Sequence, residues 1–235
     1  IGDTTYYAEP RVEKVQVRGG ETVVDTVWYT AYGPISEMNE HGTGLALRWL
    51  AHDASNELKT FYLLNRARNY SDYADALSNY SCPGQNFVYA DVENNIAIWQ
   101  QGKFKLKPKN YGKFILNGSE FGHLLEKFIP QEENPHMLNP QRGFVSSANQ
   151  PAADTTYPYY FSGVYEEFRN RTINRALRND SSVTVNDMMN LQLSNHNLLA
   201  EEALPLLLHY LDTNAFQNPE AERLALNQLK GWNYR

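Results

Sequence analysis

Five aromatic residues crowd into nine consecutive positions and form the densest group of side chains suited to a ligand. They are Tyr157, Tyr159, Tyr160, Phe161 and Tyr165. Rings of this kind stack against a sugar or an aromatic ligand, and the same rings also fill ordinary protein cores. Residue type alone leaves both interpretations open.

The titratable residues show no spacing typical of a metal site or of a glycosidase. Six histidines stand at positions 41, 52, 123, 136, 196 and 209. None of them forms the H-x-x-x-H or H-x-H patterns that hold zinc. Adjacent Glu166 and Glu167 precede several arginines on a predicted helix, where pairs three or four residues apart indicate a solvated charged face. The single Cys82 is predicted to be a small apolar group, and it excludes an internal disulfide framework.

Strands are predicted mainly in the first half of the chain. Two valine-rich runs between residues 11 and 34 are separated by Arg18-Gly19-Gly20-Glu21, which is typical of a hairpin. A second hairpin is predicted from residues 86–91 and 96–100, and a third strand from 143–148. Between the hairpins, apolar residues at three- and four-residue steps predict helix over about 45–80.

The second half is predicted to be mainly helical. The expected helices cover 164–178, 184–194, 197–212 and 219–231, with Thr184 and Asp187 as an N-terminal capping pair. Residues 103–142 are expected to form an ordered segment and not a flexible linker, because they include apolar side chains such as Phe121, Leu124 and Leu125. The fold class is therefore α+β, with strands over 1–150, a helical insertion at about 45–80, and helices over 158–235.

Composition restricts the partners. Apolar residues make up 42% of the chain and aromatic residues 13%, a content that disordered chains lack. The net charge is −6 and no basic block occurs, so nucleic acid and anionic membrane surfaces are unsuitable partners. The longest apolar run, residues 203–208, is far shorter than the ~18 residues that span a bilayer.

Several motifs occur in an order that is not generic. Residues 85–91 read QNFVYAD and are followed by Asn94-Asn95-Ile96. This run resembles the N-[FW]-x-Y-A-D-x-x-G-N-I segment of the penicillin amidase (penicillin acylase) family. Downstream, Pro130, Pro135, Asn139-Pro140, Gly143-Phe144-Val145 and Ala148-Asn149 resemble that family's P…P…N-P-x-x-G-[FY]-[VI]-x-x-A-N pattern.

The flanking segments extend the resemblance over nearly the whole chain. Upstream, Tyr7-Ala8-Glu9, Val17-Arg18-Gly19 and the run from Thr30 to Ile35 are similar to the family's E…V-K-G…T-x-x-G-P-[VI] hairpin. Near the start of the helical half, the helix entry Phe168-Arg169 through Ile173 and Leu177 resembles its Y-R-A-x-R-I-x-x-L-L helix.

The resemblance implies a layered αββα core of an N-terminal nucleophile hydrolase. In such enzymes a terminal serine attacks an amide, and its own α-amino group acts as the base. Ile1 has neither hydroxyl nor thiol, so the resemblance places the nucleophile upstream. We expect residues 1–235 to be one internal region of a longer parent that hydrolyses a small linear amide. The chain alone is expected to be inactive.

Three residues acquire roles through the resemblance. Asn149 matches the asparagine whose amide donates to the oxyanion of the tetrahedral intermediate, and the alternative is a turn residue. Arg169 matches an arginine that orients polar groups or substrate, and the alternative is a surface ion pair. Gln85 falls where aromatic-acyl amidases place an apolar wall of the acyl pocket, and the alternative is a side chain in solvent.

The resemblance also bears on cofactors, partners and location. The family often binds a structural calcium, but here Asp3 and Asp154 are the carboxylates left near those places, so no cofactor is expected and calcium is doubtful. The expected partners are the remainder of the parent chain and further copies of this chain through exposed strand edges. A periplasmic or extracellular parent is implied. A second function class stays open, namely a non-catalytic relative that binds a glycan or peptide in an aromatic cleft.

Overall fold

The computed structural model describes residues 1–109, 111–120, 127–161, 163, 165–180 and 182–235. Phe121, Leu124 and Leu125, together with His123 and the first position of the helix predicted from 164, lie outside these residues. Contacts divide the chain into two compact units. The first comprises residues 1–95, 99–136 and 155–163, and the second comprises 96–98, 137–154 and 164–235.

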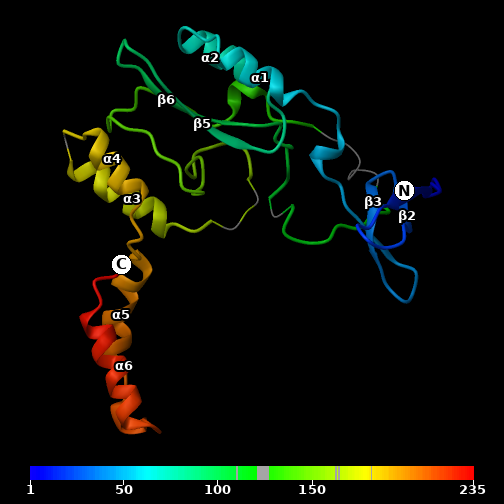
Figure 1. The fold of residues 1–235 in the computed structure, drawn as a ribbon. Helices are drawn as coiled ribbons and strands as arrows, with labels where there is room; N and C mark the ends of the chain where they lie inside the picture. The colour runs from blue at the N-terminus through cyan, green and yellow to red at the C-terminus, as the bar shows by residue number, and fades with distance from the viewer. Residues whose placement is uncertain (110, 121–126, 162, 164, 181) are drawn as a thin grey trace. The chain divides into compact units, whose positions relative to one another are not determined.

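The first sheet has four antiparallel strands in the order β1-β2-β3-β4. Its strands β2 and β3 are labelled in Figure 1. The strands are β1 (Glu9–Val15), β2 (Val23–Thr30), β3 (Gly33–Met38) and β4 (Gly44–Ala46). The register of β1 and β2 runs from Glu9 opposite Tyr29 to Val15 opposite Val23, which confirms the predicted hairpin. Gly33 begins β3 with a φ of 112°, and a Cβ there would lie 2.3 Å from the Leu47 carbonyl oxygen. Only glycine fits such a close approach.

The segment after β4 is helical over a shorter range than predicted. A 3-10 turn covers Leu50–His52, and the helices are α1 (Glu57–Leu64) and α2 (Tyr70–Leu77). Helix α1 begins at Asn56, whose side chain accepts from the Lys59 N–H, and α2 begins in the same way at Asn69. Asparagine at these positions satisfies an amide that the helix itself leaves unpaired.

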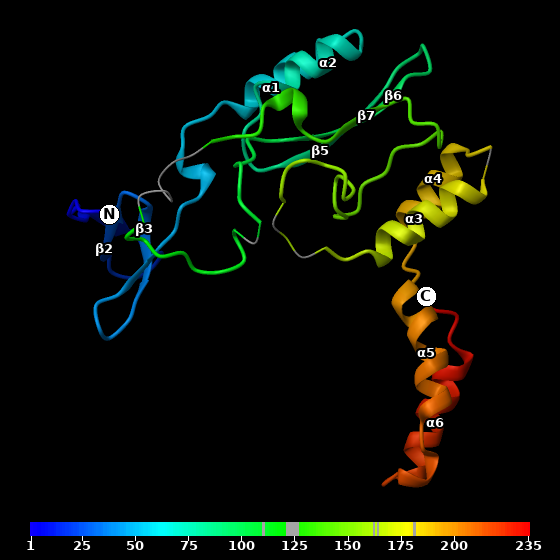
Figure 2. The same ribbon diagram turned by 180° about the vertical axis from the view of Figure 1, so that it is seen from behind.

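The second sheet has the order β5-β6-β7 and is labelled in full in Figure 2. Its strands are β5 (Gln85–Ala90), β6 (Ile96–Gln101) and β7 (His136–Leu138). The pairing of β5 with β6 confirms the second predicted hairpin. Alternate residues of β6 are buried, as a strand with one covered face requires.

The core of the first unit gathers between α2 and this sheet. Tyr73, Leu77 and Trp99 are buried together, and Phe87 and Tyr89 pack against them. The Tyr73 hydroxyl donates to the Phe87 carbonyl at 2.9 Å, so the ring is buried with its polar tip satisfied. A 3-10 turn at Gln131–Glu133 precedes β7.

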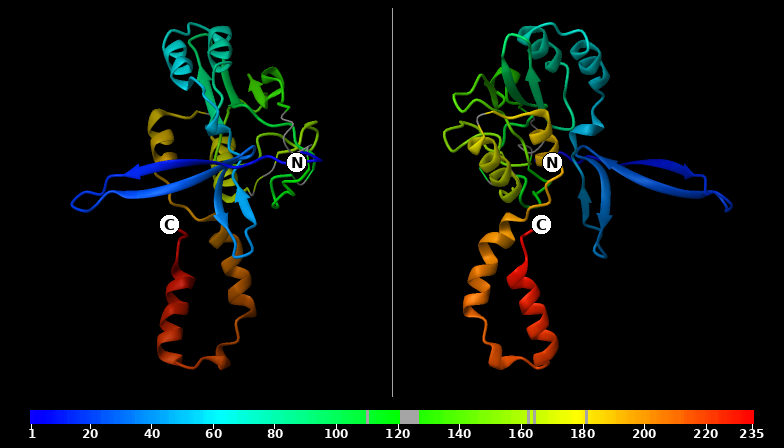
Figure 3. Two further views of the ribbon diagram at one scale, coloured as in Figure 1. Left: turned by 90° about the vertical axis from the view of Figure 1, so that its right-hand side faces the viewer. Right: turned by 60° about the vertical axis from the view of Figure 1, so that its left-hand side comes forward.

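The second unit is built mainly from helices α3 (Phe168–Asn179), α4 (Val185–Gln192), α5 (Leu198–Tyr210) and α6 (Pro219–Gly231), with a 3-10 turn at Thr213–Ala215. Helices α5 and α6 form a helical hairpin (Figure 3). The hairpin closes where the Asn197 N–H donates to the Tyr234 carbonyl at 2.8 Å. No helix in the described parts of the chain has the length and apolar character needed to cross a membrane.

The α+β prediction is confirmed, and so are the four helices of the second half. The strand predicted at 143–148 is wrong, because that segment is irregular. Its backbone groups bond locally instead of to a neighbouring strand: the Gly143 N–H donates to the Pro140 carbonyl at 2.9 Å, and the Ala148 N–H donates to a side chain two residues on.

Helix α4 shows how local sequence fixes a helix start. The Thr184 hydroxyl accepts from the Asp187 N–H at 3.3 Å, and the Asp187 carboxylate accepts from the Thr184 N–H at 2.8 Å. This confirms the predicted capping pair.

Replacing Thr184 with alanine should lower the free energy of unfolding by ~1 kcal/mol, because the Asp187 N–H loses the hydroxyl that accepts its hydrogen bond, whereas the Thr184 backbone N–H can still donate to the Asp187 carboxylate. Urea unfolding followed by far-ultraviolet circular dichroism measures the change. Ser182→Ala, two residues upstream and outside the helix, is the matched control and should leave the midpoint unchanged. Equal midpoints for the two variants would contradict the capping argument.

Candidate active site

Asn149 lies at a sharp reversal of the chain in the second unit. Its φ is 59°, in the left-handed region that asparagine tolerates better than most residues. The sequence predicts it at the end of the strand 143–148. The structure holds it in a turn instead, with the side chain exposed.

The next residue supports this turn from both sides. The Gln150 side chain accepts from the Ala148 N–H at 2.6 Å and donates to the Ser146 carbonyl at 3.1 Å. One amide side chain thereby satisfies a donor and an acceptor that a sheet would have satisfied. The left-handed position of Asn149 is fixed by its immediate neighbours.

Arg169 reaches Asn149 from the first turn of α3. Its Nη2 donates to Asn149 Oδ1 at 2.8 Å. A guanidinium carries only donors, so the atom of the amide that faces it must be the oxygen. Among the described residues nothing accepts from Asn149 Nδ2, and the N–H groups of the amide therefore point away from Arg169. Two of the residues predicted for the site are brought together here.

The segment before Asn149 is also tied to α3. Asn174 is 7% exposed, and its Oδ1 lies 3.5 Å from Arg142 Nη1 and 3.5 Å from Ser146 Oγ. Its Nδ2 donates to the Asn170 carbonyl at 2.8 Å. A buried amide with these contacts links the two segments that carry Asn149 and Arg169.

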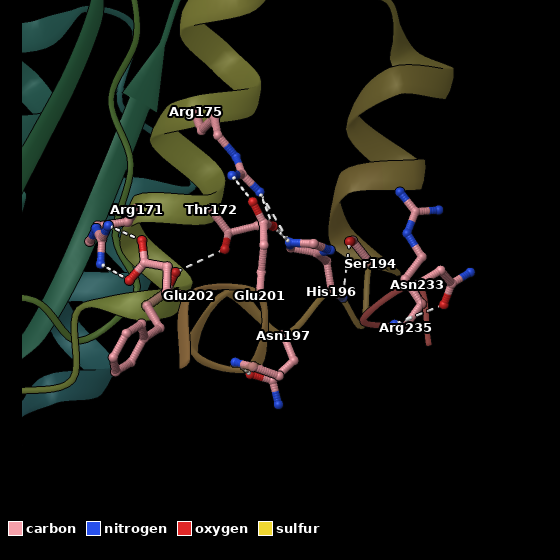
Figure 4. A network of polar contacts seen from close by, with 12 residues as sticks. Arg171, Thr172, Arg175, Ser194, His196, Asn197, Glu201, Glu202, Asn233 and Arg235 are labelled. Atoms are coloured by element: carbon pink, nitrogen blue, oxygen red, sulfur yellow. Dashed lines mark hydrogen bonds and ion pairs between the residues drawn. The ribbon is translucent and has the colours of Figure 1, made fainter. Parts of the chain in front are cut away.

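Two arginines on the far side of α3 bind acidic residues of α5 (Figure 4). Arg171 forms a two-pronged contact with Glu202, and Arg175 forms one with Glu201 at 2.9 and 3.0 Å. His196 Nε2 lies 2.5 Å from Glu201 Oε2. Two arginine–carboxylate contacts of this two-pronged kind restrict the rotation of α3 relative to α5.

Glu166 is a residue whose part in this site the sequence did not reveal. It was interpreted as one of the charged residues on a helix face, but it precedes the helix. Its carboxylate accepts from the backbone N–H groups of Phe168 and Arg169 and from Arg169 Nε at 3.3 Å. The signal present in the sequence was the three-residue spacing from Glu166 to Arg169 at a helix start.

Gln85 belongs to the other unit. It is the first residue of β5, it is exposed, and a hydrogen bond links its side chain to Tyr80.

The aromatic residues near 160 engage one another. The rings of Tyr157 and Phe161 are stacked with centroids 5.3 Å apart, and Phe104 meets Phe161 edge-on at 5.4 Å. The Tyr157 hydroxyl donates to the Glu133 carbonyl at 2.8 Å, and the Tyr159 hydroxyl donates to the Glu133 carboxylate. The stacked faces of Tyr157 and Phe161 and the hydroxyls of Tyr157 and Tyr159 are thus used in contacts within the unit. The buried Tyr160 hydroxyl, in contrast, has no hydrogen-bond partner among the described residues.

No group of three or more His, Cys, Asp or Glu side chains gathers in the parts of the chain that the structure covers. Asp3 and Asp154, the two carboxylates suggested by the sequence, fall in different units.

Comparison with known proteins shows to which family the chain belongs. The family model described as penicillin amidase matches residues 2–235. The chain belongs to the penicillin amidase family. The match covers both units, so the motifs seen in the sequence and the turn at Asn149 lie within one family region.

Related penicillin amidase family proteins are much longer than this chain. Penicillin acylase 2 proenzyme from Pseudomonas sp. (strain SE83) is 26% identical over 154 residues, which cover 64% of this chain and 20% of that protein. Penicillin G acylase from Escherichia coli is 24% identical over 161 residues, covering 63% of this chain and 18% of that protein. The chain thus matches about a fifth of the length of these relatives.

A solved structure shares the fold. The thermostable penicillin G acylase from Alcaligenes faecalis superposes with a TM-score of 0.68 over 97% of this chain and 41% of that one, at 21% identity. The α+β arrangement is therefore that of a penicillin acylase.

The Glu201 pairs predict a pH dependence. Hydrogen bonds from Arg175 and His196 hold the pKa of Glu201 at about 2, below its ordinary 4.5. A carboxylate with a lowered folded-state pKa stabilises the fold above its unfolded pKa, and that contribution is lost as the pH falls through the folded value. Glu201→Gln should therefore be less stable than the wild type near neutral pH, and the difference should shrink between about pH 4.5 and 2.

Urea midpoints at successive pH values measure this difference. Glu21→Gln, at an exposed position in the turn between β1 and β2, is the matched control and should track the wild type throughout. A constant gap between Glu201→Gln and the wild type down to pH 2 would contradict the assignment.

Proposed function

We propose that this chain is part of an amide hydrolase in which Asn149 stabilises the oxyanion. The observation that carries the proposal is the bond from Arg169 Nη2 to Asn149 Oδ1 at 2.8 Å, which leaves the Nδ2 hydrogens facing outward. A neutral amide held in this way is suited to negative charge that appears only in the transition state. Family membership supports the reaction class.

The proposed reaction is acyl transfer in two halves. A terminal serine elsewhere in the parent attacks the carbonyl carbon of a linear amide, and its α-amino group takes the hydroxyl proton. The carbonyl oxygen becomes an oxyanion, to which Asn149 Nδ2 donates. The intermediate collapses, the amine leaves with the proton, and water then releases the acid from the acyl-serine.

Arg169 orients the amide in this proposal. Its side chain is 63% exposed, so its pairing with Glu166 contributes little stability by itself. Arg169 instead fixes which end of the Asn149 amide faces the oxyanion. An amide rotated by half a turn would present Oδ1 to the oxyanion and repel it.

The remainder of the parent is the proposed partner of the apolar faces that the chain leaves exposed. In α5, Leu206, Leu207 and Tyr210 are 63%, 66% and 81% exposed. Surfaces of this kind are usually covered. The isolated chain is therefore proposed to be prone to self-association, and it is proposed to be inactive because the nucleophile is proposed to lie elsewhere in the parent. The parent's proposed location is periplasmic or extracellular, and its proposed substrate is a small amide.

Asn149→Ala in the full-length parent should lower kcat by ~10²–10³ with little change in KM, because the lost donor acts on charge that develops in the transition state. Steady-state hydrolysis of nitroanilides of phenylacetic and hydroxyphenylacetic acid measures both constants. Asn190→Ala, the same change at an exposed position of α4, should keep the wild-type kcat. A correctly processed Asn149→Ala parent with wild-type kcat would remove Asn149 from the site.

Gln85 is proposed to line the acyl pocket as a polar wall. An amide buried against a phenyl ring without a partner costs ~1–3 kcal/mol, whereas an acyl group with a hydroxyl satisfies it. Gln85→Ile in the parent should therefore shift the kcat/KM ratio by about tenfold to a hundredfold toward the phenylacetyl substrate.

The ratio between the two nitroanilides is the measurement for Gln85. Gln228→Ile, at an exposed position of α6, is the control and should leave the ratio as it is in the wild type. An unchanged ratio in the Gln85 variant would mean that its side chain faces solvent in the parent.

A further inference from the structure

Helix α3 begins differently from the other described α-helices. Helices α1, α2, α5 and α6 begin at an asparagine and α4 at a threonine, and each of these side chains accepts from an N–H of the first turn. The N-cap of α3 is Glu167, whose side chain makes no such bond. Glu166, one residue earlier, supplies the acceptor instead: its Oε1 binds the Phe168 N–H and lies 3.1 Å from the Arg169 N.

The longer side chain does something that asparagine at an N-cap does not do. The second oxygen of Glu166, Oε2, accepts from Arg169 Nε at 3.3 Å. The same carboxylate thus binds both the backbone and the side chain of Arg169. Its first oxygen fixes where the helix starts, and its second oxygen fixes the plane of the guanidinium that leaves that first turn.

The guanidinium of Arg169 is held at two places. Nε binds Glu166, and Nη2 binds Asn149 Oδ1 at 2.8 Å. A free arginine side chain samples many rotamers, and holding it still costs conformational entropy. The planar group transmits its orientation rigidly, so a bond at Nε sets the direction of the N–H groups at the other end.

From this chain of contacts we infer that Glu166 is a positioning residue for the Asn149 oxyanion donor. It holds the plane of Arg169, Arg169 holds Asn149 Oδ1, and Nδ2 is thereby presented to the oxyanion. The inference rests on the proposed role of Asn149. The exposed fractions of the Glu166 and Arg169 side chains, 46% and 63%, indicate that the pair contributes orientation more than stability.

Glu166→Gln separates this role from simple helix capping. The glutamine oxygen can still accept from the two backbone N–H groups, but its NH₂ group then faces Arg169 Nε, donor against donor. In the full-length parent we expect kcat for the phenylacetyl nitroanilide to fall about tenfold, with KM and the melting temperature near their wild-type values. Glu167→Gln is the matched control, because it changes the neighbouring carboxylate in the same way, and it should keep the wild-type kcat.

A double-mutant cycle tests whether Glu166 acts through Asn149. Adding Glu166→Gln to Asn149→Ala should lower kcat no further, since the donor that Glu166 positions is already gone. A further tenfold loss in that background would overturn the inference. So would wild-type kcat in the Glu166→Gln single variant while Asn149→Ala is impaired. Wild-type kcat in Asn149→Ala would instead overturn the proposed function itself.

Arg169→Lys provides a second route if the glutamine variant unfolds below the assay temperature. Lysine keeps the positive charge, but it lacks the planar fork that joins Glu166 to Asn149. The expected loss of kcat is again about tenfold, and it should also vanish in the Asn149→Ala background. A lysine variant with wild-type kcat would show that orientation by the guanidinium is not needed.

Discussion

The bond from Arg169 to Asn149 Oδ1 is the constraint on which the rest of the site depends. A side-chain amide has an oxygen that accepts and an NH₂ group that donates, and a partner that can only donate selects the oxygen. Arginine is such a partner at every physiological pH. The left-handed turn at Asn149, the Gln150 bonds that support it, and the start of α3 all serve to keep these two side chains within reach.

The position of α3 in turn relies on contacts at several points along its length. Asn174 ties its inner side to the segment before Asn149, and Arg171 and Arg175 tie its other side to α5 (Figure 4). Each ion pair is partly exposed and contributes little stability alone. Together they restrict rotation and sliding of the helix, and these are the motions that would move Arg169 away from Asn149.

Local signals in the sequence predicted much of the fold. The glycine turn between valine-rich runs predicted the hairpin of β1 and β2, and Thr184 with Asp187 predicted the start of α4, because such signals act through residues that are close in the chain. The strand predicted at 143–148 failed because a side chain, Gln150, satisfies backbone groups that a strand pattern assumes are free. The three-residue strand β7 has too few positions to show a period, and it was missed.

The same limit applies to the site. Similarity to a family pointed to Asn149 and Arg169, and the structure brings them together, but their catalytic roles and that of Gln85 remain predictions. Glu166 can bind both the backbone and the side chain of Arg169 only if α3 begins at one particular residue. A shift of one position turns a helix-face glutamate into a cap, and sequence patterns do not determine helix ends that closely.

At Asn149, the residue that would give the most stable fold differs from the residue that the proposed function requires. Aspartate tolerates the same left-handed backbone, and its carboxylate would bind Arg169 more strongly than an amide oxygen does. A selection for thermal stability alone would therefore favour Asn149→Asp. The exchange replaces the outward-facing N–H groups of that side chain with oxygen, so under the proposed function the more stable protein would repel the oxyanion. Asparagine at this position is a compromise of the kind that separates optimal folding from optimal activity.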